Sequence, residues 1–149
     1  MTQVVVPDSD IAERLHQIER AANAPVESAW SATDYVTLGD SGSAAILTDD
    51  AIRRGLLVLQ FAADEAEILN LAVIPQARRQ GLGRQLLTDG IDLLRSRGIA
   101  RLFLEVASDN EPARKLYQAE AFENAGVRRN YYLRTDCTRV DAVIMARSI

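Results

Sequence analysis

Three strand-like runs lie so close together in the middle of the chain that crossover connections cannot join them. They cover residues 44–48, 56–62 and 68–74, with turns rich in Asp and Glu between them. Parallel strands need a connection of about a dozen residues or more, so this spacing predicts an antiparallel meander. Any fold for this chain must contain that meander.

The pattern becomes helical after Pro75. Apolar side chains then recur at spacings of three and four residues, which predicts a helix with a wide apolar stripe that ends at Gly98. The stripe consists of Leu82, Leu86, Leu87, Ile91, Leu93 and Leu94. Residues 101–107 then alternate as a strand does, so strand, helix and strand predict a βαβ unit with parallel pairing.

Further elements complete a predicted α/β fold with a mixed sheet. A first helix is expected to begin after Asp8 to Asp10, and a second, short helix to cover residues 27–38 and carry Trp30, before a turn at residues 39–42. Asp109 or Asn110 is expected to cap a helix from about residue 110 to 120. Two last strands are expected at about residues 122–133 and 140–147.

Length and charge narrow the class of protein. A chain of 149 residues predicts one domain over residues 1–149. A net charge of −4 argues against broad electrostatic binding to nucleic acid or to an anionic membrane. No apolar run approaches the ~20 residues of a membrane span, and residues 1–10 lack signal-peptide features, so a cytoplasmic location is expected. Cys137 and His16 are each single, so we expect no disulfide and no metal site.

The strongest local signal for ligand binding is the loop Arg78–Arg84, which follows a strand and opens a helix. Free backbone N–H groups and the helix dipole favour anions there, and Gly81 and Gly83 allow close backbone approach. The arginines of the loop suit a pyrophosphate, although a tight loop with solvated arginines is equally compatible with the pattern. Leu86 in place of a third glycine argues against the dinucleotide fingerprint, and the missing Gly-Lys-Ser/Thr argues against a P-loop. A phosphorylated cofactor of another kind is therefore expected.

Glu105 gives the second signal, because it is the one acidic residue within an apolar strand. A carboxylate in such a place is a candidate general base. Asn110 lies in the loop after this strand, and Tyr117 follows two helical turns later on the same helix face. A carboxylate on an exposed strand face and a packing tyrosine are the plain alternatives.

Together these motifs resemble the Gcn5-related N-acetyltransferase (GNAT) superfamily. Its motif Q/R-x-x-G-x-G/A reads here as Arg78 to Gly83, after the strand that ends at residues 70–75. Within the superfamily the chain resembles the RimI-type ribosomal-protein alanine N-acetyltransferases. The matching segments are Leu71–Val73, Arg79–Arg84, Leu104–Val106, Arg128–Tyr132 and Asp141–Ala146. The run Arg128–Tyr132 is the most specific of them, whereas residues 23–30 depart from the group's Phe-Pro-Trp-type stretch.

The resemblance implies a mixed, mostly antiparallel, twisted sheet of about six to seven strands with about four helices. It implies acetyl-CoA as co-substrate and no metal, with Glu105 as general base and Tyr117 as general acid. Tyr131 and Tyr132 should point to opposite faces of a strand, so only one of them can line the substrate groove, and the resemblance implies that it is Tyr131. The residues expected to bind the cofactor are Leu71, Ala72 and Val73 through their backbone, Arg78, Arg79, Gln80, Gly81, Leu82, Gly83 and Arg84 around the pyrophosphate, and Asn110.

For the acceptor, the resemblance implies the N-terminal α-amine of a protein, in this group the N-terminal alanine of a small-subunit ribosomal protein. Acetylation of a lysine or a small amine is the alternative, favoured by the altered residues 23–30. A non-catalytic acyl-CoA-binding module is a third interpretation, but it should have lost Glu105 or Tyr117. A monomer or weak oligomer without direct nucleic-acid contact is expected.

Overall fold

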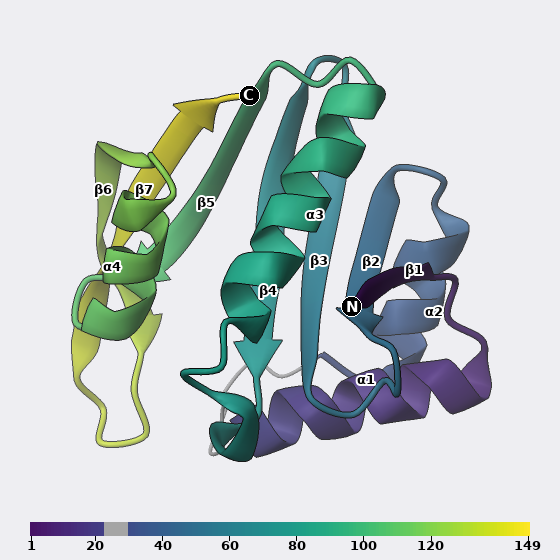
Figure 1. The fold of residues 1–149 in the computed structure, drawn as a ribbon. Helices are drawn as coiled ribbons and strands as arrows, with labels where there is room; N and C mark the ends of the chain where they lie inside the picture. The colour runs from purple at the N-terminus through teal and green to yellow at the C-terminus, as the bar shows by residue number, and fades with distance from the viewer. Residues whose placement is uncertain (23–29) are drawn as a thin grey trace.

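The computed structural model describes residues 1–22 and 30–149, and Figure 1 shows their arrangement. The elements are β1 (Thr2–Val5), α1 (Ser9–Ala22), α2 (Ala32–Asp40), β2 (Ala44–Asp49), β3 (Gly55–Ala62), β4 (Glu65–Val73), a 3₁₀ turn η1 (Pro75–Ala77), α3 (Leu82–Ser96), β5 (Arg101–Ala107), α4 (Glu111–Ala119), β6 (Glu123–Leu133) and β7 (Arg139–Ser148). None of the helices in these residues is long and apolar enough to cross a membrane.

The described strands form one sheet in the order β1-β2-β3-β4-β5-β7-β6. Strands β2, β3 and β4 are the predicted antiparallel meander, and β4 pairs with β5 in parallel through the crossover helix α3. The β5–β7 and β6–β7 pairs are antiparallel. The predicted α/β class, with a mixed and mostly antiparallel sheet, is confirmed.

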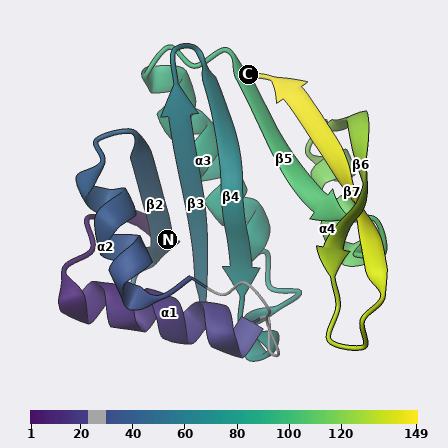
Figure 2. The same cartoon turned by 180° about the vertical axis from the view of Figure 1, so that it is seen from behind.

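Helices cover the two faces of the sheet at different places. Helices α3 and α4 lie on one face, while α1 and α2 lie on the other, toward β2 and β3 (Figures 1 and 2). The alternation predicted for β5 is confirmed, because Leu102, Leu104 and Val106 are buried in the core beneath α3 and α4. Figure 2 shows that no helix covers the opposite face of β5 in the described part of the chain, and Glu105 belongs to that face.

Two sequence expectations near the N-terminus were wrong. The second helix begins at Ala32 and continues to Asp40, so Trp30 precedes it and Gly39 belongs to the helix; residues 27–29 lie outside the described residues. A capping box sets this start, since the backbone N–H of Asp34 donates to Ser31 Oγ and the backbone N–H of Ser31 donates to the Asp34 carboxylate. The short strand β1 was not foreseen, and it pairs with β2 at the edge of the sheet.

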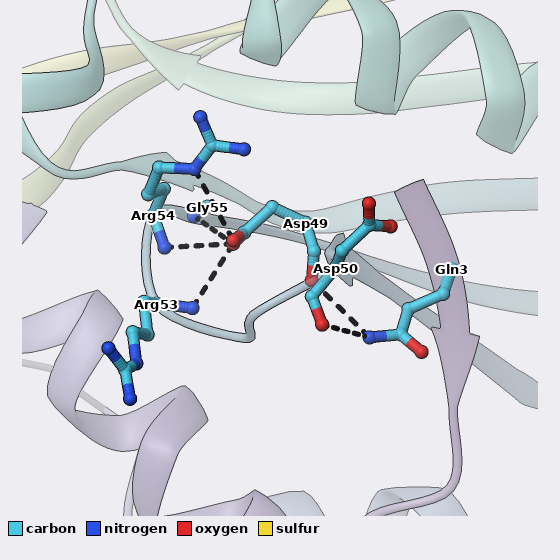
Figure 3. A network of polar contacts seen from close by, with 6 residues as sticks. All are labelled: Gln3, Asp49, Asp50, Arg53, Arg54 and Gly55. Atoms are coloured by element: carbon cyan, nitrogen blue, oxygen red, sulfur yellow. Dashed lines mark hydrogen bonds and ion pairs between the residues drawn. The ribbon is translucent and has the colours of Figure 1, made fainter. Parts of the chain in front are cut away.

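A buried carboxylate closes the turn between β2 and β3. Asp49 is fully buried, and its Oδ1 accepts the backbone N–H groups of Arg53, Arg54 and Gly55 at 3.2, 2.8 and 3.1 Å (Figure 3). Gln3 of β1 donates to the carbonyl oxygen of Asp50 in the same turn. Burial alone would raise the pKa of Asp49, but these N–H groups and the Arg54 side chain hold it below the usual range.

Candidate functional site

The sheet opens between its two parallel strands. Residues 65–68 of β4 pair with residues 101–104 of β5, whereas β5 continues to pair with β7 as far as Ala107. Over residues 69–73, β4 is therefore paired with β3 alone, and Figures 1 and 2 show β4 and β5 separating toward their C-terminal ends. Leu69 forms a bulge there, because Val58 and Leu59 of β3 lie opposite Asn70 and Ile68. The backbone of Leu71, Ala72 and Val73, which the sequence analysis predicted to bind the cofactor, thus borders the opening.

The glycine loop lies at the end of the same strand. Gly81 is the N-cap of α3 with a φ of +81°, and its carbonyl oxygen accepts the N–H of Gln85. The N–H groups of Leu82, Gly83 and Arg84 belong to the first helical turn, where no acceptor within the helix is available. A Cβ on Gly83 would lie 3.7 Å from Val73 Cγ2, so the start of α3 packs against the end of β4. The free N–H groups at the start of α3 therefore lie next to the end of β4, whose edge toward β5 is unpaired.

Two arginines of this loop already have partners within the protein. Arg78 donates through Nε to the carbonyl oxygen of Val73 at 3.0 Å and through Nη2 to that of Ala22 at 2.7 Å. Arg84 Nε lies 2.7 Å from Oε1 of Glu120. The sequence pattern assigned both charges to a pyrophosphate, but here Arg78 ties the loop to β4 and α1, and Arg84 ties α3 to the end of α4. Arg79 has a φ of +61° and Gln80 donates to the carbonyl oxygen of Gln76.

Glu105 lies at the middle of β5, on the open face. Its side chain is 19% exposed, and its Oε1 accepts Arg128 Nε of β6 at 2.6 Å. Glu67 of β4 shares this face, because Glu67 pairs with Phe103, two residues before Glu105. Burial raises the pKa of Glu67, the charge of Glu105 adds to the increase, and Arg128 opposes it. The face therefore holds two carboxylates with one neighbouring guanidinium.

The two adjacent tyrosines do not point to opposite faces as predicted. The ring centroids of Tyr131 and Tyr132 lie only 5.1 Å apart, in an edge-to-face arrangement. The reason is an irregularity between Arg128 and Tyr132, where Asn130 has a φ of +50° and its N–H donates to the Asp141 carboxylate. Tyr131 is half exposed beneath the Arg128 guanidinium, the two being 5.7 Å apart.

Tyr132, which the sequence did not single out, is the more enclosed of the pair. Burial raises its pKa, and Glu105 is the largest charged contribution to the same increase. Asn130 was the available signal, because asparagine tolerates a positive φ and so allows a bulge that turns both rings to one side.

Tyr117 is buried on α4 against Phe122, with ring centroids 5.5 Å apart. Burial raises the pKa of the Tyr117 hydroxyl, and Tyr132 adds to this increase. Glu105 thus contributes to the raised pKa of Tyr132, and Tyr132 to that of Tyr117. Asn110 is the N-cap of α4, where its Oδ1 accepts the N–H of Ala113 at 3.3 Å. Within residues 1–22 and 30–149, no three His, Cys, Asp or Glu side chains are grouped as metal ligands.

The family model, the relatives and the solved structure described next are all of acetyltransferases. Residues 12–122 match the acetyltransferase (GNAT) family. The chain is 47% identical over 103 residues, 69% of each chain, to the [ribosomal protein bS18]-alanine N-acetyltransferase of Escherichia coli. It is 40% identical over 136 residues to the Salmonella typhimurium protein of the same name, covering 89% of this chain and 88% of that protein. The crystal structure of the E. coli enzyme superposes with a TM-score of 0.83 at 37% identity, over 100% of this chain and 94% of the other.

Proposed function

Because this chain belongs to the GNAT family of acetyltransferases, we propose that it transfers an acetyl group from acetyl-CoA to the N-terminal α-amine of a protein. The relatives that are 40–47% identical are named for an alanine of ribosomal protein bS18. The N-terminal alanine of a ribosomal protein is accordingly the acceptor we propose here. The observation that carries the proposal is the opening of β4 from β5 beside the start of α3, with Glu105 on the adjoining strand.

The residues around the opening suit acetyl-CoA. The 69–73 edge of β4 offers backbone hydrogen bonds to an extended amide chain such as pantetheine, as a neighbouring strand would. The first turn of α3 offers N–H groups and the positive end of the helix dipole to a pyrophosphate. Arg79 adds positive charge to this loop. Arg78 fixes the loop through its hydrogen bonds to the carbonyl oxygens of Val73 and Ala22. Asn110 remains a predicted cofactor contact.

We assign the proton transfers to Glu105 and Tyr117. Acetyl transfer needs a neutral amine, and Glu105 takes the amine proton, directly or through a water molecule. A backbone N–H near Val73 polarises the thioester carbonyl, and the amine nitrogen then forms the new C–N bond as the C–S bond breaks. Tyr117 gives its proton to the leaving thiolate; a tyrosine hydroxyl is protonated at neutral pH, and burial raises the pKa of this one further. The nitrogen gives its second proton to the Tyr117 phenolate, and Glu105 releases the first to water, so the amide and the free thiol leave neutral and both side chains are restored.

An α-amine is the easier acceptor for a single carboxylate. Its pKa is about 7.7–8.0, against about 10.4 for a lysine amine. The difference corresponds to roughly 3.5 kcal/mol for deprotonation at neutral pH. We therefore expect a free N-terminal alanine to react well ahead of an internal lysine.

Mass spectrometry on two matched peptides tests the proposal. One peptide begins with a free alanine and contains no lysine; the other has the same sequence with a blocked N-terminus and one internal lysine. We expect rapid acetylation of the first and at most slow acetylation of the second, with acetyl-CoA as donor. Faster reaction of the lysine would establish the alternative acceptor class. Calorimetric binding of acetyl-CoA without transfer to either peptide, or to a free small amine, would establish a non-catalytic module.

A further inference from the structure

A second buried carboxylate lies on α1, the helix that covers the same face of the sheet as α2. Glu19 of α1 is 4% exposed and accepts three hydrogen bonds. Its Oε2 accepts the backbone N–H of Trp30 at 3.1 Å and the Tyr35 hydroxyl at 2.9 Å. Its Oε1 accepts the side-chain amide of Asn70 at 3.1 Å. Nothing in the proposed chemistry uses this carboxylate.

The partners of Glu19 come from α2, from the residue before its N-cap, and from β4. Trp30 precedes the N-cap of α2 and Tyr35 lies in its first turn, while His16, one turn before Glu19 on α1, places its Nδ1 2.8 Å from the carbonyl oxygen of Trp30. Asn70 belongs to β4 and directly follows the bulge at Leu69. It is also the second residue of the 69–73 segment that has left β5. Glu19 thus joins α1 and the start of α2 to the part of β4 that faces the opening.

The chemistry of the network favours a geometric role. Burial raises the pKa of Glu19, while the bonds from Tyr35 and Trp30 and the charge of His16 lower it. A buried carboxylate costs stability unless hydrogen bonds compensate for the lost water, and an apolar side chain would avoid that cost. What the carboxylate provides, and an apolar side chain cannot, is a fixed direction for the Asn70 side chain and so for the bulge.

We propose that Glu19 is a positioning residue for acetyl transfer, which acts through Asn70 to hold the bulged 69–73 segment of β4 in its reactive alignment. This inference rests on the proposed function, because it assigns a task to the β4 backbone in that reaction. A displacement of about 1 Å at a reacting group costs up to about 100-fold in rate. Glu19→Ala and Asn70→Ala should accordingly lower kcat by about 10- to 100-fold.

Two further variants separate positioning from general stability. Tyr35→Phe removes one bond to the same carboxylate but leaves the Glu19–Asn70 bond, so its Tm should fall while kcat stays within about threefold of wild type. Glu19→Gln should also retain kcat, since its oxygen can accept from Trp30 and its amide can donate to a rotated Asn70 side chain.

The experiment measures kcat, the KM of each substrate and Tm for wild type, the four single variants and the Glu19→Ala/Asn70→Ala double variant on one alanine peptide. Support requires low kcat in Glu19→Ala and Asn70→Ala, no further loss in the double variant, and near-normal kcat in Tyr35→Phe and Glu19→Gln. If kcat falls in Tyr35→Phe as in Asn70→Ala at equal loss of Tm, or if the two alanine losses multiply, the positioning role is wrong. No transfer by wild type would overturn the proposed function itself.

Discussion

At the scale of the residue, Asp49 determines how the β2–β3 turn responds to acid. Three backbone N–H groups converge on its buried carboxylate, so Asp49→Asn should lower the free energy of unfolding by about 2 kcal/mol at pH 7. Its pKa is lowered in the folded protein, so this contribution is present above the unfolded pKa of about 3.9 and is lost as pH falls through the folded value. The difference between variant and wild type should therefore shrink below about pH 4.

Urea denaturation at several pH values measures this contribution. Asp50→Asn is the matched control, because Asp50 is exposed in the same turn and contributes its carbonyl oxygen, which the substitution keeps. A difference between Asp49→Asn and wild type that persists undiminished at acid pH would show that the charge of Asp49 has no part in closing the turn.

Single residues also mark where sequence reasoning reaches its limit. Glu105 could be found because a charge stands out in an apolar strand, and its place on the open face follows from the alternation of β5. The partners of Arg78 and Arg84 could not be found, because Ala22 and Glu120 are distant in sequence. The direction of Tyr132 was missed for another reason: it depends on an irregularity for which Asn130 was the one local signal.

At the scale of the element, the start of α3 is built so that a ligand can approach its backbone. A Cβ on Gly83 would meet Val73 and Leu116 at 3.7 and 3.8 Å, which is ordinary contact, so Gly83→Ala should fold with a Tm close to that of wild type. The added methyl group would nevertheless stand beside the N–H groups assigned to pyrophosphate. We expect the Kd for acetyl-CoA to rise by about 10-fold or more, which is about 1.4 kcal/mol.

Calorimetric titration with acetyl-CoA, combined with thermal unfolding, tests this prediction. Gly98→Ala is the control: Gly98 has a positive φ, +76°, unlike Gly83, and it follows the far end of α3. That variant should lose Tm and keep its affinity. An unchanged Kd in Gly83→Ala would remove the first turn of α3 from the cofactor site.

Elements were predictable where a local pattern was sufficient to define them. The meander, α3 and α4 follow from apolar periodicity, the short connections and the cap at Asn110. The start of α2 was misplaced, although the Ser31–Asp34 capping box was present in the sequence as a signal. β1 was missed because four residues at a sheet edge carry too little pattern, and only their pairing with β2 makes them a strand.

At the scale of the whole molecule, the opening between β4 and β5 is the feature that no local pattern predicts. The resemblance to a family implied only that the backbone of Leu71, Ala72 and Val73 binds the cofactor. Physically the opening arises because β5 stays paired with β7 while β4 stays paired with β3, and the bulge at Leu69 bends β4 where the two strands part. The 69–73 edge of β4 and Glu105 of β5 border the opening, and the glycine loop follows the end of β4, which suits the transfer that we propose between two bound substrates.

The central claim is that Glu105 takes the proton of an α-amine and Tyr117 protonates the leaving thiolate. Glu105→Gln and Tyr117→Phe keep the shapes of the side chains and remove these two functions. Neither should greatly change the Kd for acetyl-CoA, because loop and strand backbone hold the cofactor in the proposed site.

The most direct test is the pH profile of kcat/KM for wild type and both variants on one peptide with a free N-terminal alanine. Glu105→Gln should be slower by a factor on the order of 10²–10⁴ at pH 7 and should recover much of this loss toward pH 9, where the amine deprotonates unaided. Tyr117→Phe should remain equally impaired at both pH values. A Glu105→Gln defect that is the same at every pH would contradict the account, and Glu67 on β4 would become the candidate base.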